Sequence, residues 1–359
     1  MRHIRALMLG LSLIALIIAF LGYLVLQEIR LPVSKDAKAA GVEIVVEKGE
    51  STSQIAAKLR GAGLIRQPLL FTALARAQEL DSKLQAGHYL LTPTLTMSQI
   101  MIQLQTNPVS VEVAVTIPEG LRLEEIAVIT SKAGFGTVED FMYIARNSTS
   151  FRAKHALLAN LPAGASLEGY LFPDSYRFAK NAKLQTIIET MLSRFDEQYK
   201  TFETKVQVPN VNVHQLVTMA SIVQRESALT SEMPLIAGVF WNRLKPENAP
   251  ETGSGKLEAD PTLQYALGYS EEEGTWWRKD ITLEDLKSEN PYNMRKWPGL
   301  PPGPICNPGL DALRSAAQPD ASKNYLYFVV NCKLDGSHNF ASNFKQFQSF
   351  EAEYLKCRK

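Results

Sequence analysis

The chain has 359 residues, which is enough to bury a sizeable core and to form two or more domains. Its formal net charge of +1 gives no bulk electrostatic field that would favour nucleic acid as a partner. The three cysteines are too few and too scattered for a zinc site, and the five histidines show no paired metal-ligand spacing, so we expect no metal and no cofactor.

Residues 6–26 form an uninterrupted apolar run of about the 20 residues that a membrane-spanning helix needs. Arg2 and Arg5 precede the run, so the positive-inside rule places residues 1–5 in the cytoplasm and everything after the run outside the inner membrane. A cleaved signal peptide is the alternative, but its apolar region is typically only about 7–15 residues long. We therefore expect an uncleaved single-pass anchor in the inner membrane, followed by a linker over 27–40.

A small module is predicted over residues 41–106. Alternating apolar residues before Gly49 indicate a strand, and two helical segments follow, the second of which starts at Pro68. A short strand over 86–90 and a helix over 98–104 complete the module. This order resembles a LysM-like module, a fold that grips glycan chains in other proteins, but a structural spacer explains the same pattern equally well.

The next stretch, 111–127, echoes the start of the module at 42–56. The apolar residues and one glycine fall in the same register in both stretches. We interpret this as one strand–turn–helix unit used twice, which is too few copies for a solenoid.

Helices are predicted over 141–146 and 184–199, with the aromatic segment 166–178 between them. That segment interleaves tyrosines and phenylalanines with charged residues, among them Glu168. Such a mixture suits the faces and hydroxyl groups of a sugar, but a packed loop is the simpler interpretation.

Residues 214–244 have the pattern of two helices joined by a short turn. Apolar residues recur at helical spacing from Leu216 to Val223, and three residues further on the same face comes Glu226. A carboxyl at the end of a core-facing stripe is held partly away from water, which raises its pKa and suits a general acid. Solvation or an ion pair with Arg225 is the alternative, but we expect the helix to point Arg225 elsewhere and desolvation to prevail.

Three segments of special composition follow. Residues 256–268 contain a turn or a helix start at Asp260, and 324–331 form a strong strand pattern. The stretch 289–309 has too many prolines and glycines for regular structure, and a long irregular loop inside a compact domain is usually functional or disordered. Its aromatic and aliphatic residues argue against disorder.

The cysteines have two possible states in an exported domain. Cys306 and Cys332 could pair and leave Cys357 free, or all three could remain thiols. The sequence does not decide between these states.

A series of short motifs resembles, in order and in spacing, the successive signatures of the YceG-like family of endolytic murein transglycosylases. The motifs are ASIVQRES, GVFWNRL, LEADPTLQYALG, PYN, GLPPGPICNPG, YLYFV and GSHNF. The resemblance implies a YceG-like catalytic domain over 111–355, and it fits the anchor and the module. The expected fold class is α+β, with an N-terminal transmembrane helix, a small LysM-like module and a mixed α+β catalytic domain.

The resemblance implies an enzyme that cuts peptidoglycan glycan strands internally, between N-acetylmuramic acid and N-acetylglucosamine, without adding water. The catalytic acid of the family falls on Glu226. Whereas ordinary glycosidases use two carboxyls, one is sufficient here: Glu226 protonates the leaving oxygen and then takes the proton from the muramic acid's own primary hydroxyl, which closes an anhydro ring.

The matching motifs also supply candidates for binding the substrate, which are Asn242, Asp260, Thr262, Gln264, Tyr292 and Asn293. Glu168, which lies outside these motifs, is a weaker candidate as a second carboxyl at the substrate. For each of them a hydrogen bond that braces a loop is an equally good interpretation. The chain departs from the family's frequent PYNTY string, because Met294 and Arg295 follow Tyr292 and Asn293, which puts a second aromatic contact with sugar in doubt.

Other functions remain open. A hydrolytic muramidase would need a second carboxyl, for which Glu168 or Asp260 is available. A non-catalytic scaffold that binds peptidoglycan is a third possibility. Relatives have also carried the label aminodeoxychorismate lyase, but the expected exported location argues against that pyridoxal phosphate enzyme. The expected partners are glycan strands, with peptidoglycan synthases and the elongation or division machinery implied only by the family setting.

Overall fold

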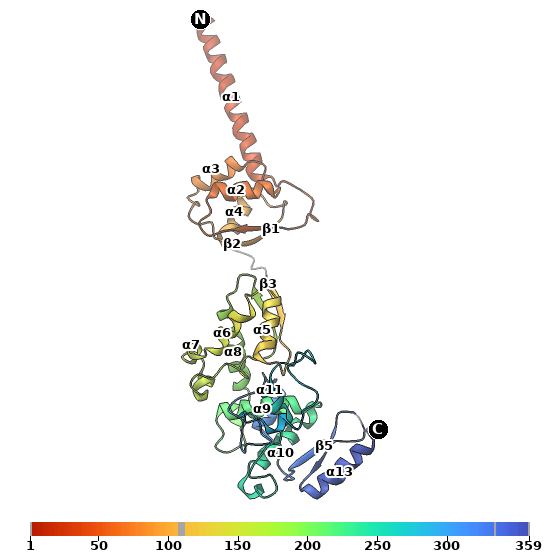
Figure 1. Ribbon diagram of the computed structural model, residues 1–359. Helices are drawn as coiled ribbons and strands as arrows, with labels where there is room; N and C mark the ends of the chain where they lie inside the picture. Colours follow the sequence, from red (N-terminus) through yellow and green to blue (C-terminus); the bar gives the residue numbers. More distant parts are fainter. Residues whose placement is uncertain (1, 107–111, 334, 358–359) are drawn as a thin grey trace. The chain divides into compact units, whose positions relative to one another are not determined.

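The computed structural model describes residues 2–106, 112–333 and 335–357, except for the side chains of residues 2–12 and 15. The chain divides into two compact units, Met1–Glu112 and Val113–Lys359 (Figure 1). Within the described residues, the strands form three two-stranded sheets among many helices, so the fold class is mixed α+β, as expected.

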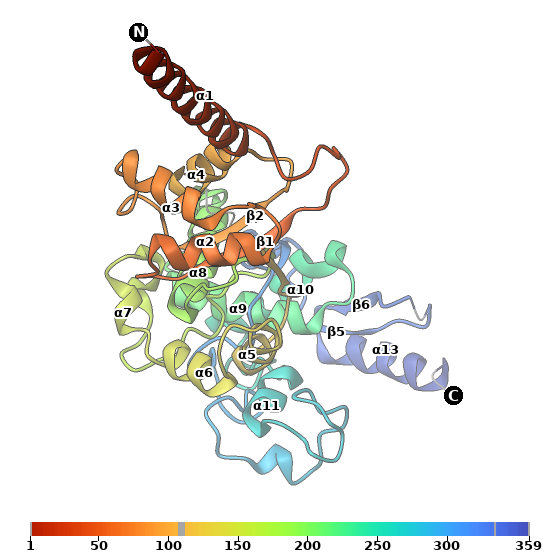
Figure 2. The ribbon, with the colours of Figure 1, turned by 90° about the horizontal axis from the view of Figure 1, so that it is seen from above.

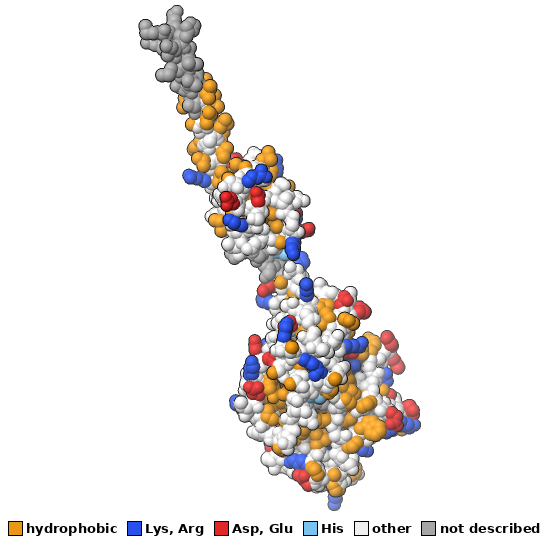
Figure 3. All heavy atoms as spheres, turned by 90° about the vertical axis from the view of Figure 1, so that its left-hand side faces the viewer, with side chains coloured by type: hydrophobic (Ala, Val, Ile, Leu, Met, Phe, Trp, Pro, Cys, Tyr) orange, Lys and Arg blue, Asp and Glu red, His pale blue; other side chains and the backbone are white. Residues whose placement is uncertain are grey.

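The first helix, α1, covers Arg2–Arg30. Its described side chains from Leu13 to Leu26 are largely apolar and exposed (Figure 3). Of the helices built from described residues, none combines the length and the apolar character that a membrane crossing requires. Much of the predicted span at 6–26 lies outside the described side chains, so the anchor stays a prediction.

The rest of the first unit is a strand–helix–helix–strand–helix module, as the sequence predicted. Two antiparallel strands pair Val42 with Leu91 and Val46 with Gly87, and α2 runs beside them (Figure 2). Ser51 caps α2 in a capping box with Gln54. The elements are β1 (Val42–Val46), α2 (Thr52–Gly61), α3 (Pro68–Ala77), β2 (Gly87–Leu91) and α4 (Met97–Thr106).

The second unit begins with a strand–turn–helix unit that repeats the one in the module, as predicted. Ile44 and Val46 are buried in the first copy, and Val115 and Ile117 are buried in the second. The strand β3 pairs with β4. The elements of this part are β3 (Glu112–Thr116), α5 (Leu123–Lys132), α6 (Val138–Arg146), α7 (Thr149–Arg152), β4 (Ser175–Ala179) and α8 (Leu184–Lys200).

The aromatic segment 166–178 is a packed loop that runs into β4. Tyr170, Phe172, Tyr176 and Phe178 are all buried in the core of the second unit. The simpler interpretation of this segment is therefore correct, because its rings pack inward.

The predicted helix pair at 214–244 is present as α9 (Val213–Glu226) and α10 (Met233–Arg243). Both helices pack against α12 (Leu310–Ala317), and α11 (Asp260–Leu267) contacts α9. Short 3₁₀ helices connect these parts at Ala156–Asn160, Glu203–Lys205, Thr230–Glu232, Pro246–Asn248 and Asp285–Lys287.

The C-terminal part is a hairpin followed by a helix. β5 (Tyr327–Val330) and β6 (His338–Ala341) are antiparallel, and α13 (Phe344–Cys357) packs against both of them (Figure 2). Figure 1 shows α13 leading to the C-terminus.

A disulfide joins Cys332, in the hairpin connection, to Cys357, at the end of α13. Neither the predicted Cys306–Cys332 pair nor three free thiols is therefore correct. Cys306 is buried beside α9, where its Sγ lies 3.3 Å from the Ser221 carbonyl oxygen and burial raises the pKa of its thiol. The sequence could not show this, because the pairing depends on α13 folding back along the hairpin.

Candidate active site

Glu226 is the last residue of α9, and the residues that cap, bury and end this helix place it there. Asn212 caps the helix: its side chain accepts a bond from the Gln215 backbone N–H at 2.9 Å, and the Gln215 side chain accepts one from the Asn212 N–H at 3.0 Å. Residues 216–223 are buried without interruption, so the helix is fixed in the core. Ser227 adopts an extended conformation and ends the helix at the carboxyl group.

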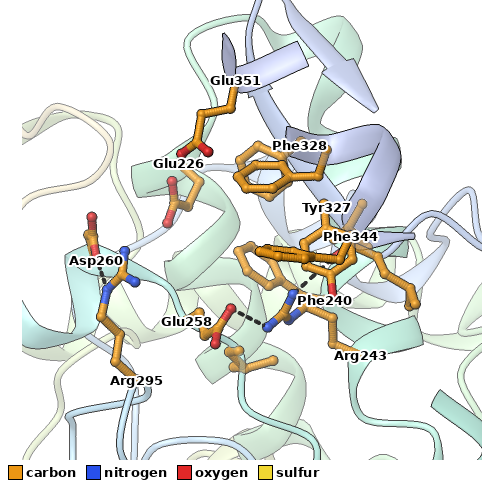
Figure 4. A pocket seen from close by; sticks show the side chains of 14 residues that line it. Glu226, Phe240, Arg243, Glu258, Asp260, Arg295, Tyr327, Phe328, Phe344 and Glu351 are labelled. Atoms are coloured by element: carbon orange, nitrogen blue, oxygen red, sulfur yellow. Dashed lines mark hydrogen bonds and ion pairs between the residues drawn. The ribbon is translucent and has the colours of Figure 1, made fainter. Parts of the chain in front are cut away.

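A pocket of about 400 Å³ lies beside this end of α9 (Figure 4). Its walls come from α9, α10, the start of α11, the long loop 289–309, β5 and α13. The lining residues are Glu226, Val239, Phe240, Arg243, Leu257, Glu258, Asp260, Arg295, Leu326, Tyr327, Phe328, Phe344, Phe347 and Glu351.

The Glu226 carboxyl lies between a packed core and the pocket. Burial raises its pKa to about 8, and the negative charge of Asp260 acts in the same direction, whereas Arg295 and Arg225 oppose the shift. The negative end of the α9 dipole also disfavours a carboxylate at this position. At neutral pH the group is therefore mostly protonated and able to donate a proton.

Arg225 points away from its neighbour in the chain, as expected. Its guanidinium carbon lies 3.8 Å from the centre of the Trp277 ring, and its Nη1 is 3.5 Å from the Gly120 carbonyl oxygen. Because this cation is engaged elsewhere, desolvation dominates the pKa of Glu226, and the predicted outcome is confirmed.

Asp260 and Arg295 form an ion pair within the same pocket. Asp260 is the first residue of α11, and its Oδ1 lies 2.5 Å from the Arg295 Nε. Arg295 occupies the position at which the family's string often has a second aromatic residue, and Met294 beside it is buried in the core. At this position the chain therefore has an ion pair in place of the second aromatic residue whose contact with sugar was in doubt.

Arg243 braces the floor of the pocket. It is only 3% exposed, and its three donor groups reach three separate acceptors. Nη2 pairs with Glu258 Oε2 at 2.6 Å, Nη1 donates to the Leu326 carbonyl at 2.9 Å, and Nε donates to the Lys256 carbonyl at 2.8 Å. One side chain thereby ties α10 to the segment before α11 and to the start of β5.

Glu168 lies in a different place. It is 4% exposed and lines a separate cavity of about 360 Å³. Its Oε1 accepts a bond from Asn307 Nδ2 at 2.9 Å, and its Oε2 accepts one from the Leu123 N–H at 3.2 Å. Burial, with the nearby charge of Glu124, raises its pKa to about 8. This carboxyl holds the start of α5 against the long loop, and it is not among the residues that line the Glu226 pocket.

Tyr292 lines the same separate cavity as Glu168, beside His214. Its ring centre is 4.9 Å from that of Tyr265, and burial raises the pKa of its hydroxyl to about 12. The structure therefore brings two of the predicted residues, Glu168 and Tyr292, together away from Glu226. Of the predicted substrate ligands, Asp260 shares a pocket with Glu226.

The remaining four candidates use their side chains to bond backbone carbonyl groups. The bonds run from Asn242 to Tyr325, from Asn293 to Leu286 and Ser288, from Thr262 to Ala259, and from Gln264 to Arg278. These bonds brace the loops around the site, and none of the four residues is part of the described pocket lining. Their role as substrate ligands stays a prediction.

Sequence reasoning missed most of the pocket wall. Arg243 and Glu258 lie inside two of the quoted motifs, so their position was a usable signal. Phe344, Phe347 and Glu351 share one face of α13 by their spacing of three and four residues, but no motif marks them.

No metal centre is evident in the part of the chain that the structure describes. Among those residues, no group of three or more His, Cys, Asp and Glu side chains is placed to hold a metal ion.

Comparisons with known proteins show the family of the chain. The model of the YceG-like family matches residues 44–353. An endolytic murein transglycosylase of Streptococcus pneumoniae (strain D39) is 29% identical over 381 residues; the match covers 99% of this chain, which spans 66% of the length of that relative. The endolytic murein transglycosylase of Bacillus subtilis (strain 168) is 30% identical over 336 residues, covering 91% of this chain and 88% of the relative.

A solved structure of a yceG-like protein also matches this chain. The crystal structure of a yceG-like protein from Listeria monocytogenes is 28% identical and aligns with a TM-score of 0.57, covering 87% of this chain and 99% of that one. The motifs, the family match over most of the sequence and the shared fold agree. The chain belongs to the YceG-like family.

Proposed function

We propose that this protein is an endolytic murein transglycosylase that cuts the bond between N-acetylmuramic acid and N-acetylglucosamine within glycan strands. The observation that carries the proposal is the Glu226 carboxyl, which lies at a pocket of about 400 Å³ with a pKa raised to about 8. Relatives at 29–30% identity that are named for this activity support it.

In the first step, neutral Glu226 donates its proton to the glycosidic oxygen as the bond from that oxygen to the anomeric carbon of the muramic acid breaks. The departing glucosamine leaves with a hydroxyl group. The muramic acid ring passes through an oxocarbenium-like state, and the ionised Glu226 beside it compensates that positive charge.

In the second step, the primary hydroxyl of the same muramic acid attacks its anomeric carbon, and Glu226 takes the proton from that hydroxyl. The product is a 1,6-anhydro ring, the acid is regenerated, and no water is consumed. The attacking group is already part of the substrate, so the reaction avoids the entropy cost of positioning a water molecule.

The two carboxyl groups that the sequence offered as the base of a hydrolase are both held by other residues. Glu168 lines a separate cavity, and Asp260 is held by Arg295. Neither candidate base that the sequence offered is therefore free to activate water at the Glu226 pocket. Glu258 and Glu351 also line the Glu226 pocket, so the products must distinguish the two activities. A scaffold without turnover would have no need of a protonated carboxyl in a pocket, although it remains the alternative that an inactive wild type would favour.

Product analysis tests the proposal. Uncross-linked glycan strands are digested with the full-length wild type and with Glu226→Gln, and the fragments are weighed by mass spectrometry. We expect wild-type fragments that end in anhydro-muramic acid, each lighter by one water than a hydrolytic fragment, and no fragments from Glu226→Gln. Reducing ends would indicate a muramidase, and intact glycan with the wild type would indicate a scaffold.

We further propose that residues 6–26 anchor the protein in the inner membrane, with residues 1–5 in the cytoplasm and the catalytic unit outside. Arg2 and Arg5 before the apolar run support this orientation, and the exposed apolar side chains between Leu13 and Leu26 support the anchor itself. The Cys332–Cys357 disulfide suits an oxidising compartment. Protease added to intact spheroplasts should digest the catalytic unit; protection until the membrane is broken would contradict this orientation.

A further inference from the structure

The C-terminal residues 326–357 form one wall of the Glu226 pocket, and the hairpin part of this wall is fixed to α10. The Leu326 carbonyl accepts a bond from Arg243, and the Phe328 ring centre lies 5.8 Å from that of Phe240. His338 Nδ1 is 2.7 Å from Glu232 Oε2 at the start of α10. The hairpin is thus a rigid support beside the pocket.

The helix α13 is less buried than the hairpin. None of its described residues is buried, and its main contacts are with β5 and β6. The disulfide from Cys332 to Cys357 ties its far end to the hairpin. The position of α13 therefore depends on a few surface contacts and one covalent link.

The face of α13 that lines the pocket carries aromatic rings that are partly exposed to solvent. The rings of Tyr327, Phe344 and Phe347 form a cluster with centre-to-centre distances of 5.3–6.0 Å. The Phe344 side chain is nevertheless 49% exposed. Exposed apolar rings that border a pocket are typical of a binding surface, because their contact with water is unfavourable until a ligand covers them.

Glu351 follows on the same face of α13, one turn after Phe347, and extends toward Glu226 in Figure 4. Within the described residues it makes no hydrogen bond or ion pair, whereas Glu258 pairs with Arg243 and Asp260 pairs with Arg295. The wall thus combines open aromatic faces with one uncommitted hydrogen-bond acceptor.

We propose that this wall is a saccharide-binding subsite, on which Phe344 and Phe347 stack against the C–H face of one N-acetylhexosamine and Glu351 accepts hydrogen bonds from its hydroxyl or acetamido N–H groups. The inference rests on the proposed function and adds a residue-level account of how the strand is held beside Glu226. A pyranose ring presents an apolar C–H face and a polar rim, which is the combination that the wall complements. The disulfide keeps this subsite in place.

The test is steady-state cleavage of uncross-linked glycan by the full-length protein. KM is compared between each variant and the wild type, because glycan held elsewhere on the chain affects all of these proteins alike. We expect Phe344→Ala, Phe344→Leu and Glu351→Ala each to raise KM about five- to tenfold, with the pH of the alkaline limb of kcat/KM unchanged. Phe344→Tyr, which keeps the ring, should restore KM.

Matched controls lie on the same helix. Leu355 is 55% exposed and Glu353 is a carboxylate, and neither lines this pocket, so Leu355→Ala and Glu353→Ala should leave KM unchanged. If Phe344→Ala fails to fold, Glu351→Ala carries the test, because it removes an exposed side chain without partners. The double variant Cys332→Ser with Cys357→Ser should raise KM as the ring variants do.

The outcomes separate the inference from the function. A wild type that cuts glycan while the Phe344 and Glu351 variants keep the wild-type KM overturns the subsite and leaves the proposed function intact. A wild type that leaves the glycan whole removes both. An unchanged KM in the double serine variant overturns the role of the disulfide.

Discussion

The Arg295 guanidinium and the Asp260 carboxylate form an ion pair in the Glu226 pocket, with 2.5 Å between Nε and Oδ1. Their charges act on Glu226 in opposite directions: Asp260 raises the pKa of its carboxyl and Arg295 lowers it. The pKa of Glu226 therefore depends on both members of the pair.

The two members of the pair should shift the pH dependence of activity in opposite directions. The proposed mechanism requires protonated Glu226, so it predicts that kcat/KM falls as the pH rises through the pKa of that group. Asp260→Asn should move this alkaline limb to lower pH, and Arg295→Gln should move it to higher pH, each by roughly half to one unit. Profiles of kcat/KM from pH 5 to 10 check this; a shift in the same direction for both variants would contradict the assignment.

Burial of Glu226 should cost stability as the pH rises. The pKa of about 8 in the folded state lies above the ordinary value of 4.5, so the folded chain binds more protons than the unfolded chain between these limits. The free energy of unfolding then decreases from about pH 4.5 to about pH 8. Glu226→Gln removes this penalty, and it should stabilise the protein at pH 8 by roughly 1–3 kcal/mol, a figure reduced for the partial exposure of the side chain.

Urea unfolding at pH 5 and at pH 8 measures this effect. The difference in unfolding free energy between Glu226→Gln and the wild type should grow with pH. An equal difference at both values would mean that Glu226 is already ionised in the folded protein at pH 5.

Glu168 should matter for stability and not for chemistry. Both of its oxygens accept bonds, from the Asn307 side chain and from the Leu123 N–H. In Glu168→Gln an amide N–H₂ faces one of these donors, which should cost about 1–3 kcal/mol of unfolding free energy. The residual kcat of the folded variant should stay within a few-fold of the wild type; a loss of about a hundredfold with stability intact would instead identify a second catalytic carboxyl.

Arg243 should be required for the pocket to keep its shape. Replacement by Met leaves the Glu258 carboxylate and the carbonyls of Leu326 and Lys256 without their donor. We expect Arg243→Met to lose about 2–4 kcal/mol of unfolding free energy, since Glu258 is itself half-exposed. Thermal unfolding by circular dichroism reports this loss. Wild-type stability would show that the hairpin is held mainly by other contacts.

Much of the fold follows from local patterns in the sequence. The apolar spacing from Leu216 to Val223 predicted the helix, and continuing that spacing placed Glu226 at its end. The repeated strand–turn–helix unit was visible because Ile44 and Val46 match Val115 and Ile117 in register, and all four are buried. These features depend on residues that are close together in the chain, so they can be recognised from the sequence.

The rest depends on contacts between distant segments. The residues next to Glu168 in the sequence do not indicate that its side chain bonds to Asn307, which is 139 residues further along the chain. They also do not indicate that Glu168 lies away from Glu226. The pairing of Cys357 with Cys332 requires α13 to fold back on its hairpin, which spacing alone does not predict. Phe344 and Glu351 became candidates only when the structure placed them in the lining of the Glu226 pocket.

The central claim is that the carboxyl group of Glu226 is neutral in the folded protein near pH 7. Difference infrared spectroscopy of the carboxyl band, wild type minus Glu226→Gln, isolates this group from Glu168, which contributes equally to both proteins. We predict a protonated band that disappears with a midpoint near pH 8. A difference band that is already lost below pH 6 would contradict the account, because Glu226 would then be ionised before it could donate a proton.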